Sequence, residues 1–211
     1  MPVCSIQSPS EFTGLRVPGA AGYRDSSYTR DFRGIANLAL TVTLIFLAAS
    51  VSVATDSPGK LELTTMAFGP GSTIPTQFTC SGVNISPSLS WNHPPPRTRS
   101  FVLIVDDPDA PAGTWVHWVL YNLPASARQL PEHVPPGDAV AGGGKQGVND
   151  FPTNGYGGPC PPPGKPHRYF FRLYALDTVL NFRAPVHRKD VDSAMKGHVL
   201  AQAELMGTFG R

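Results

Sequence analysis

Residues 106–122, DDPDAPAGTWVHWVLYN, decide how the rest of the sequence is interpreted. The first half of this stretch places Asp107 and Asp109 in a loop that is stiff, because its prolines fix φ and remove backbone donors. The second half is an aromatic strand that carries His117. An acidic loop beside a histidine-bearing strand predicts a small polar pocket in an otherwise apolar wall.

Alternation along this strand predicts which side chains share a face, because successive side chains of a strand point to opposite sides. Four side chains are expected on one face, namely Trp115, His117, Val119 and Tyr121. Three are expected on the other face, namely Val116, Trp118 and Leu120. The preceding run, residues 101–105, is continuously apolar, which predicts a fully buried strand that ends at the two carboxylates.

Short strands separated by Pro- and Gly-rich connections are expected on both sides of this hairpin. The predicted strands lie near residues 61–63, 89–91, 168–176 and 201–209, with an edge or irregular strand around Pro75. One helix is predicted near the end, capped by Asp190 or Asp192, with apolar spacing that extends to Val199. Because no strand–helix–strand rhythm is present, the pattern favours an all-β fold, an antiparallel sandwich or barrel.

Composition supports a turn-rich globular domain and gives no sign of a nucleic-acid partner. Pro 23 and Gly 21 together make about a fifth of the 211 residues, below the roughly 25–30% that marks low complexity. The formal net charge is only +2, and no run of Lys or Arg stands out. The length suits one domain with an appendage, or two small domains.

The appendage is N-terminal. Residues 1–34 mix Ser, Pro, Gly and charges without periodicity and are predicted to be disordered, and residues 35–54 form an uncharged, largely apolar run. Small residues at its end predict a secretory signal peptide cleaved after Ala54. The length of the run also allows an uncleaved membrane anchor or a buried core helix. Under the first two interpretations, residues 55–211 form an exported domain that is periplasmic or secreted, or anchored at the membrane.

The cysteine count fits an exported domain. Cleavage after residue 54 would remove Cys4 and leave Cys80 and Cys160. An even pair in an exported domain is consistent with one disulfide. Two free thiols that never meet are the alternative, because spacing along the chain does not fix geometry in space.

The polar side chains near the central stretch fit several kinds of site; they are Asp107, Asp109, His117 and His167. Imidazoles and glycine N–H groups can hold a phosphate, and two Asp with two His can ligate a metal. A His–Asp pair can also perform acid–base catalysis. Equally, the aspartates can cap turns while the histidines satisfy buried backbone groups. No HExxH, GxSxG, Walker or CxxC motif occurs in the sequence.

Four separated motifs occur in order along the chain: DPDAP at 107–111, WVHW at 115–118, GYGGPCPPPG at 155–164 and HRY at 167–169. They resemble the phosphatidylethanolamine-binding protein family, most closely its bacterial and archaeal branch, sometimes called Raf kinase inhibitor-like. SPSLSW at 86–91 and GHVLAQAELMGTFGR at 197–211 fit the same branch. The resemblance covers residues 61–211 and leaves the leader outside.

This resemblance implies an antiparallel β-sandwich of the phosphatidylethanolamine-binding type, with one short C-terminal helix and a small anion-binding cavity at one end. The ligand-binding residues that it implies are Asp107, Asp109, His117, Gly158, His167 and Tyr169. It also implies a protein that is not an enzyme, needs no cofactor or metal, and binds phosphate or phosphoethanolamine-like headgroups. Cys160 stands where eukaryotic members usually have a glycine.

The expected chemistry is donation of hydrogen bonds to a bound anion by the Gly158 backbone N–H and the imidazole nitrogens. A neighbouring carboxylate would raise the pKa of a histidine and strengthen binding toward about pH 6. Two other functions stay open. Family relatives inhibit kinases or proteases by protein contact, and the stiff loops at 131–164 offer a surface for an extracytoplasmic protease. The other possibility is a metal-dependent hydrolase that uses Asp107, Asp109, His117 and His167.

Overall fold

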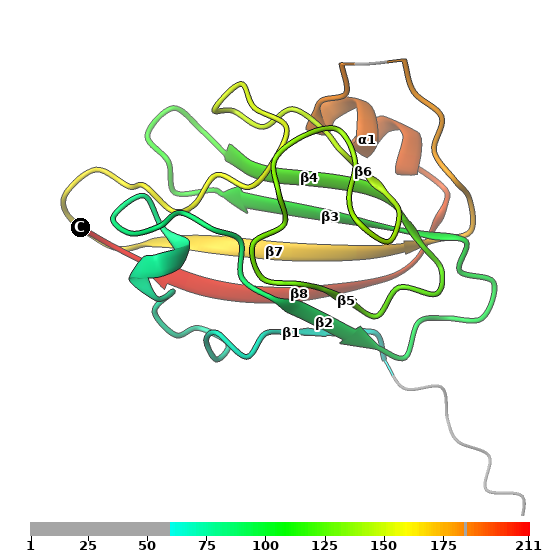
Figure 1. Ribbon diagram of the computed structural model, residues 1–211, viewed down its shortest axis with the longest axis horizontal. Helices are drawn as coiled ribbons and strands as arrows, with labels where there is room; N and C mark the ends of the chain where they lie inside the picture. Colours follow the sequence, from blue (N-terminus) through cyan, green and yellow to red (C-terminus); the bar gives the residue numbers. More distant parts are fainter. Residues whose placement is uncertain (1–59, 184) are drawn as a thin grey trace, which may run out of the picture. The chain divides into compact units, whose positions relative to one another are not determined.

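The computed structural model describes residues 60–183 and 185–211, so the predicted disordered segment 1–34 and the predicted leader 35–54 lie outside the described residues. Figure 1 shows two antiparallel sheets and one helix, α1 (Arg188–Met195). The smaller sheet has the order β1 (Glu62–Thr64), β2 (Leu89–Asn92) and β5 (Gln129–Leu130). The larger sheet has the order β6 (Lys145–Gln146), β4 (Trp115–Pro124), β3 (Ser100–Asp107), β7 (His167–Leu176) and β8 (Val199–Phe209). The predicted antiparallel β-sandwich with one short helix is confirmed.

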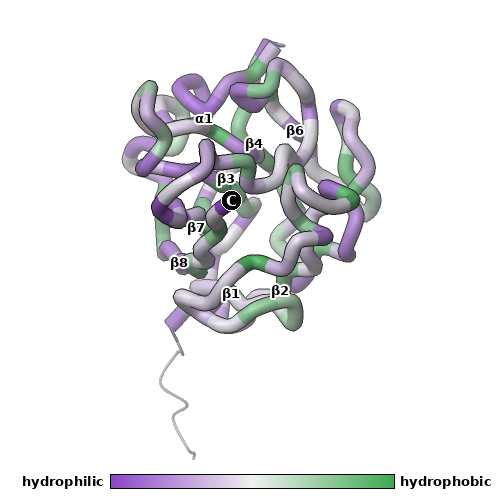
Figure 2. Tube along the Cα trace, turned by 90° about the vertical axis from the view of Figure 1, so that its left-hand side faces the viewer, coloured by the Kyte–Doolittle hydropathy of each residue, from purple (hydrophilic) through white to green (hydrophobic). Residues whose placement is uncertain are grey.

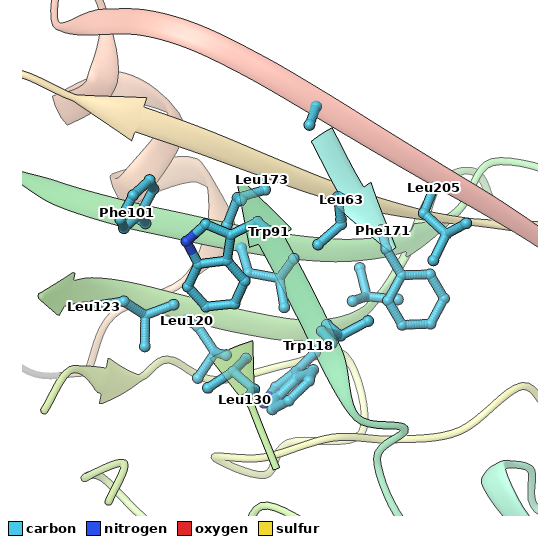
Figure 3. Close-up of a cluster of buried hydrophobic side chains, with 14 of the residues drawn as sticks. Leu63, Trp91, Phe101, Trp118, Leu120, Leu123, Leu130, Phe171, Leu173 and Leu205 are labelled. Carbon is cyan, nitrogen blue, oxygen red and sulfur yellow. The ribbon is translucent and has the colours of Figure 1, made fainter. Parts of the chain in front are cut away.

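The main core lies between the two sheets. Strand β3 contributes Phe101 and Leu103 to this core. Figure 3 shows Phe101 in the same cluster as Trp91 of β2 and Trp118 of β4. The Trp91 and Phe101 rings meet edge to face with their centroids 5.6 Å apart. Burying each such side chain contributes about 1.5–3 kcal/mol, so this layer dominates the stability of the sandwich.

A second core covers the opposite face of the larger sheet. Val102 and Ile104 of β3 pack there with Val191 and Met195 of α1. Figure 2 shows α1 and the β1–β2 pair on opposite sides of the row formed by β4, β3, β7 and β8. Because β3 is covered on both faces, every one of its residues is buried, as its continuous apolar run predicted. No helix within the described ranges combines the length and apolar character needed to cross a bilayer.

The predicted simple alternation along β4 is wrong, because the strand contains bulges. Val105 pairs with Trp118 and Asp106 pairs with Val116, so His117 is an extra residue without a partner on β3. Because of this extra residue, Val116 and Trp118, which were predicted to share a face, lie on opposite faces of the sheet. Trp118 faces the core between the sheets, while Val116 faces the α1 side.

Three other local features differ from the sequence predictions. Helix α1 begins at Arg188 with His187 as its N-cap, whose backbone N–H donates to the Asp190 side chain at 2.9 Å. Asp190 is therefore the third residue of a capping box and not the cap itself. Val199 begins β8 instead of extending the helix. The irregular strand expected near Pro75 is a 3-10 turn, η1 (Thr76–Phe78).

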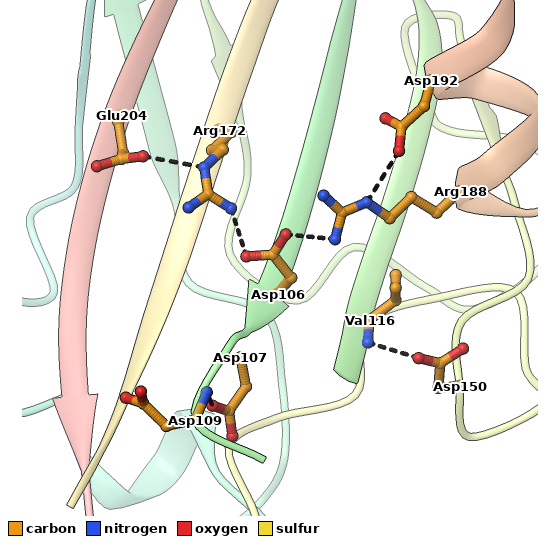
Figure 4. Close-up of polar contacts among 9 residues, drawn as sticks. All are labelled: Asp106, Asp107, Asp109, Val116, Asp150, Arg172, Arg188, Asp192 and Glu204. Carbon is orange, nitrogen blue, oxygen red and sulfur yellow. Dashed lines mark hydrogen bonds and ion pairs between the residues drawn. The ribbon is translucent and has the colours of Figure 1, made fainter. Parts of the chain in front are cut away.

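A buried carboxylate connects three elements on the α1 side of the larger sheet (Figure 4). Asp106 is 1% exposed and accepts hydrogen bonds from Arg172 of β7 and Arg188 of α1, each at 2.5 Å. Arg172 also donates to Glu204 of β8 at 2.9 Å, and Arg188 donates to Asp192 at 3.2 Å. A buried charge is tolerated only with such partners, so Asp106 ties the end of β3 to β7 and α1.

A disulfide connects two loops at one end of the sandwich. Cys80 follows η1 and is bonded to Cys160; their Cα atoms are 5.3 Å apart, and the two residues are 80 positions apart in sequence. The Cys80 backbone N–H also donates to the Pro159 carbonyl at 3.1 Å. The predicted pairing is confirmed, and it fastens residues 155–164, which we call the flap, to the turn after η1.

Replacing Asp106 by Asn would leave two guanidinium groups without their buried carboxylate. We expect the free energy of unfolding to fall by about 3 kcal/mol, at the low end for a broken buried ion pair, because both arginines keep partial access to water. Urea denaturation followed by tryptophan fluorescence measures this loss.

Asp177→Asn is the matched control, since the ion pair between Asp177 and His198, 2.9 Å long, is solvent-accessible on both sides. A loss of less than about 1 kcal/mol is expected for it. Equal losses in the two variants would contradict the role assigned to Asp106.

Candidate functional site

A cavity of about 250 Å³ lies where β3, β4, β7 and the flap meet. Its polar lining consists of Asp107, His117 and His167. Its remaining walls are largely apolar and come from Ala110, Pro111, Trp115, Phe151, Cys160, Pro161 and Pro162. The structure therefore brings together, in one small space, three of the six predicted ligand-binding residues.

A larger groove of about 680 Å³ runs between β1 and β8. Its charged members are Lys60, Glu62 and Glu204, all of them solvent-exposed. The smaller cavity is the better candidate because its titratable groups are buried and converge on one point.

Asp107 fixes the acidic side of the cavity. Its carboxylate is 3% exposed; one oxygen accepts the Asp109 backbone N–H at 2.8 Å and the other lies 2.7 Å from His167 Nδ1. The first bond is an Asx turn, which holds the Pro-containing loop in shape. The second bond orients the His167 ring, so that its other nitrogen, Nε2, is left for a ligand.

Asp109 was predicted to bind the ligand, but the structure places it outside the cavity wall. Its carboxylate accepts two hydrogen bonds from the Arg168 guanidinium, at 2.7 and 2.9 Å, and one from the Arg168 backbone N–H at 3.0 Å. This guanidinium lowers the pKa of Asp109 to about 2 despite the opposing effect of desolvation. Asp109 therefore anchors the loop to the start of β7.

His117 sits at the bulge in β4 and is 3% exposed. Its Nδ1 lies 2.6 Å from the Gly157 carbonyl oxygen, and its ring meets Phe151 and Tyr169 edge to face at 5.3 and 5.2 Å. Burial lowers the pKa of His117 below its ordinary value, although the Gly157 carbonyl and Asp107 act in the opposite direction. The expectation of a raised pKa is therefore wrong for this histidine.

Gly158 was predicted to donate its backbone N–H to the ligand, but that N–H donates to the Asn84 side chain at 2.8 Å. A Cβ atom at Gly158 would lie 2.4 Å from the Phe78 carbonyl oxygen, so this position requires glycine for close packing. The Cys160 N–H donates to no atom of the described residues, and Cys160 lines the cavity. The Gly158 N–H is therefore already used within the protein.

Tyr169 lies fully buried behind His117 and does not form part of the cavity wall. Burial and the nearby Asp107 carboxylate raise the pKa of Tyr169 well above its ordinary value, so the phenol keeps its proton. Its hydroxyl has no hydrogen-bond partner within the described part of the chain, and the same is true of Trp115 Nε1. Trp115 does line the cavity together with His117, as expected from their predicted place on one face of the strand, and its buried N–H is a donor without a partner there.

Phe151 reaches the cavity through a loop that the sequence presented only as Gly- and Pro-rich. Asn149, 3% exposed, accepts the backbone N–H groups of Phe151 and Thr153 and donates to the Gly155 carbonyl at 2.9 Å. One buried amide thus shapes the turn that brings Phe151 against Trp115 and His117.

The assembled site can hold a small polar group against an apolar wall. It offers the buried, unpartnered N–H of Trp115 and the N–H of the exposed Cys160, together with two imidazoles and one carboxylate. Within residues 60–183 and 185–211, no three His, Cys, Asp or Glu side chains are grouped so that they could hold a metal ion. With donors and acceptors set in an apolar wall, the cavity can bind a small polar ligand through hydrogen bonds.

Comparison with known proteins agrees with this architecture. The family model described as phosphatidylethanolamine-binding protein matches residues 64–210. The UPF0098 protein of Methanothermobacter thermautotrophicus is 50% identical over 151 residues, which cover 72% of this chain and 99% of the relative. The UPF0098 protein of Aquifex aeolicus is 48% identical over 153 residues, covering 72% and 89%.

Two solved structures share the fold. A putative phosphatidylethanolamine-binding protein homolog from Chlamydia trachomatis has a TM-score of 0.66 and 41% identity, covering 72% of this chain and 98% of that one. YbcL of E. coli, described as a new member of the mammalian PEBP family, has a TM-score of 0.66 and 33% identity, covering 72% and 99%. With a family match over most of the described residues and relatives of this similarity in bacteria and archaea, the chain belongs to the phosphatidylethanolamine-binding protein family.

Proposed function

We propose that this protein is a non-catalytic binding protein whose cavity takes phosphate or a phosphoethanolamine-like group. The observation that carries the proposal is the convergence of Asp107, His117 and His167 on one cavity of about 250 Å³. The unpartnered N–H of Trp115 supports it, because a buried donor without a partner is costly and a bound oxyanion would satisfy it.

Binding an anion here requires a proton. Asp107 is buried and bears a negative charge beside the cavity, so a second bare anion would be repelled. That charge is offset when a proton resides on His117, on His167 or on the ligand. Above neutral pH, the complex therefore holds one more proton than the free protein and the free ligand hold together.

We also propose that the domain is exported, with the leader at residues 35–54 acting as signal peptide or anchor. The disulfide between Cys80 and Cys160 supports export, because such bonds persist in oxidising compartments. Cell fractionation, with N-terminal sequencing of the mature protein, tests this part of the proposal. A reduced protein recovered from the cytoplasm with residues 35–54 intact would overturn it.

His117→Gln should weaken the binding of O-phosphoethanolamine by about tenfold to a hundredfold, the range expected when one hydrogen bond to a charged group is lost. Isothermal titration calorimetry measures the dissociation constant. NMR of the wild-type imidazoles should show both His117 and His167 shifting on titration.

His133→Gln is the matched control, because His133 is exposed and lies outside the cavity lining. It should bind like the wild-type protein. Wild-type protein that binds no phosphate compound, with both cavity imidazoles unaffected, would overturn the proposed function.

Affinity should rise as pH falls from about 8 to about 6. Burial lowers the pKa of His117, so the ring is neutral at pH 7 and the proton that the complex needs must be taken up. Uptake of one proton changes affinity by about tenfold per pH unit. Calorimetry in two buffers of different ionisation enthalpy measures the proton uptake directly. An affinity that does not change with pH would contradict the uptake of a proton on binding.

Reducing the disulfide should weaken phosphate binding, because Cys160 is both bonded to Cys80 and part of the cavity wall. Releasing the bond should also lower the free energy of unfolding by about 2–4 kcal/mol. Titrations with and without reductant, repeated on the Cys80→Ala/Cys160→Ala variant, measure both effects. Equal affinity in the oxidised and reduced states would show that the bond does not position the flap.

A further inference from the structure

We propose that the cavity selects oxyanions that bring a proton of their own, so that it prefers phosphomonoesters and inorganic phosphate to phosphodiesters and sulfates. The selecting group is His117, which presents a hydrogen-bond acceptor to the ligand. This inference rests on the proposed function and narrows its ligand class.

The tautomer of His117 follows from its partner. A carbonyl oxygen has no hydrogen to donate, so the 2.6 Å contact between Nδ1 and the Gly157 oxygen requires the proton to be on Nδ1. The Gly157 backbone N–H donates in return to the His117 carbonyl at 2.9 Å. This reciprocal pair locks the ring against the flap. In the neutral ring, Nε2 then carries a lone pair and acts as a hydrogen-bond acceptor. It is the ring nitrogen that remains available to a ligand in the cavity.

Adding a proton to Nε2 would create a buried cation. The ring is 3% exposed and is packed edge to face against Phe151 and Tyr169. The charged and titratable groups around it are Asp106 and Asp107 at the end of β3 and His167 and Tyr169 on β7. Their combined effect does not overcome burial, which lowers the pKa of His117. A ligand therefore meets an acceptor at this point and must supply the hydrogen.

Asp107 reinforces the same preference. Its two oxygens already accept from His167 and from the Asp109 backbone, at 2.7 and 2.8 Å, and its negative charge stays beside the cavity. In the same cavity, the buried Trp115 Nε1 offers a hydrogen without a partner among the described residues, and the exposed Cys160 also lines the wall. A cavity that holds a free donor together with an acceptor and a carboxylate complements a group that has both P–O⁻ and P–OH.

Only some oxyanions have that combination near neutral pH. A phosphomonoester has a second pKa of about 6, so about half of it carries a P–OH at that pH. Phosphodiesters and sulfate esters are fully ionised and carry none. A sulfate ester can bind only if His117 or His167 takes up a proton, and a fixed acceptor that lacks its hydrogen costs affinity.

The test compares matched pairs by calorimetry at about pH 6 on the full oxidised protein. O-phosphoethanolamine is paired with ethanolamine O-sulfate, which has the same shape without the acidic hydrogen, and inorganic phosphate is paired with sulfate. Glycerophosphoethanolamine represents the diester. We expect the phosphorus member of each pair to bind at least tenfold more tightly and the diester to bind like the sulfates. The comparison of inorganic phosphate with O-phosphoethanolamine shows which source of the phosphate group is preferred.

Equal affinities within each pair would overturn this inference and leave the proposed function standing, whereas binding of none of the probes would overturn the proposed function itself. His117→Gln provides a second readout, because an amide can donate as well as accept and should reduce the phosphate-to-sulfate ratio to within about threefold. His133→Gln should keep the wild-type ratio. Independently of any variant, ¹⁵N NMR of the O-phosphoethanolamine complex should show His117 Nε2 without a proton, and an imidazolium there would refute the inference.

Discussion

Two adjacent buried carboxylates at the end of β3 set the constraint on which the rest of the structure depends. Asp106 and Asp107 are 1% and 3% exposed, and as consecutive strand residues they point to opposite faces of the sheet. Each needs partners because an unpaired buried charge is strongly unfavourable. Asp106 finds two arginines on the α1 side, while Asp107 finds His167 on the cavity side. The structural network and the candidate site are therefore built from one dipeptide, and both depend on how β7 is positioned.

The flap wall of the cavity is held in place by contacts with residues outside the cavity. The disulfide of Cys160, the Gly158 N–H bond to Asn84 and the reciprocal pair of Gly157 with His117 each hold the flap at a different point. Prolines between these points remove further freedom. Because the chain entropy of this wall is lost on folding, little of it remains to oppose binding.

Local patterns in the sequence predicted the fold class, the buried β3 strand and the elements that form the cavity, because alternation, apolar runs and turn residues are local properties. These local patterns did not predict the hydrogen-bond or ion-pair partner of each polar group. Asp109 was expected in the cavity but pairs with Arg168, and the Gly158 N–H was expected to be free but bonds Asn84, 74 residues away in sequence. The bulge at His117 depends on how β4 pairs with β3, which periodicity within one strand does not record. The depressed pKa of His117 follows from burial by Phe151 and Tyr169, which come from two other segments.

The fastened flap has a kinetic consequence. Under the proposed function, a flap fastened at three points does not need to close over the ligand. Association would then be limited by diffusion and orientation, and the lifetime of the complex would be set by the hydrogen bonds that the ligand makes. A cavity of this kind would follow changes in ligand concentration quickly and would be poorly suited to long-term storage.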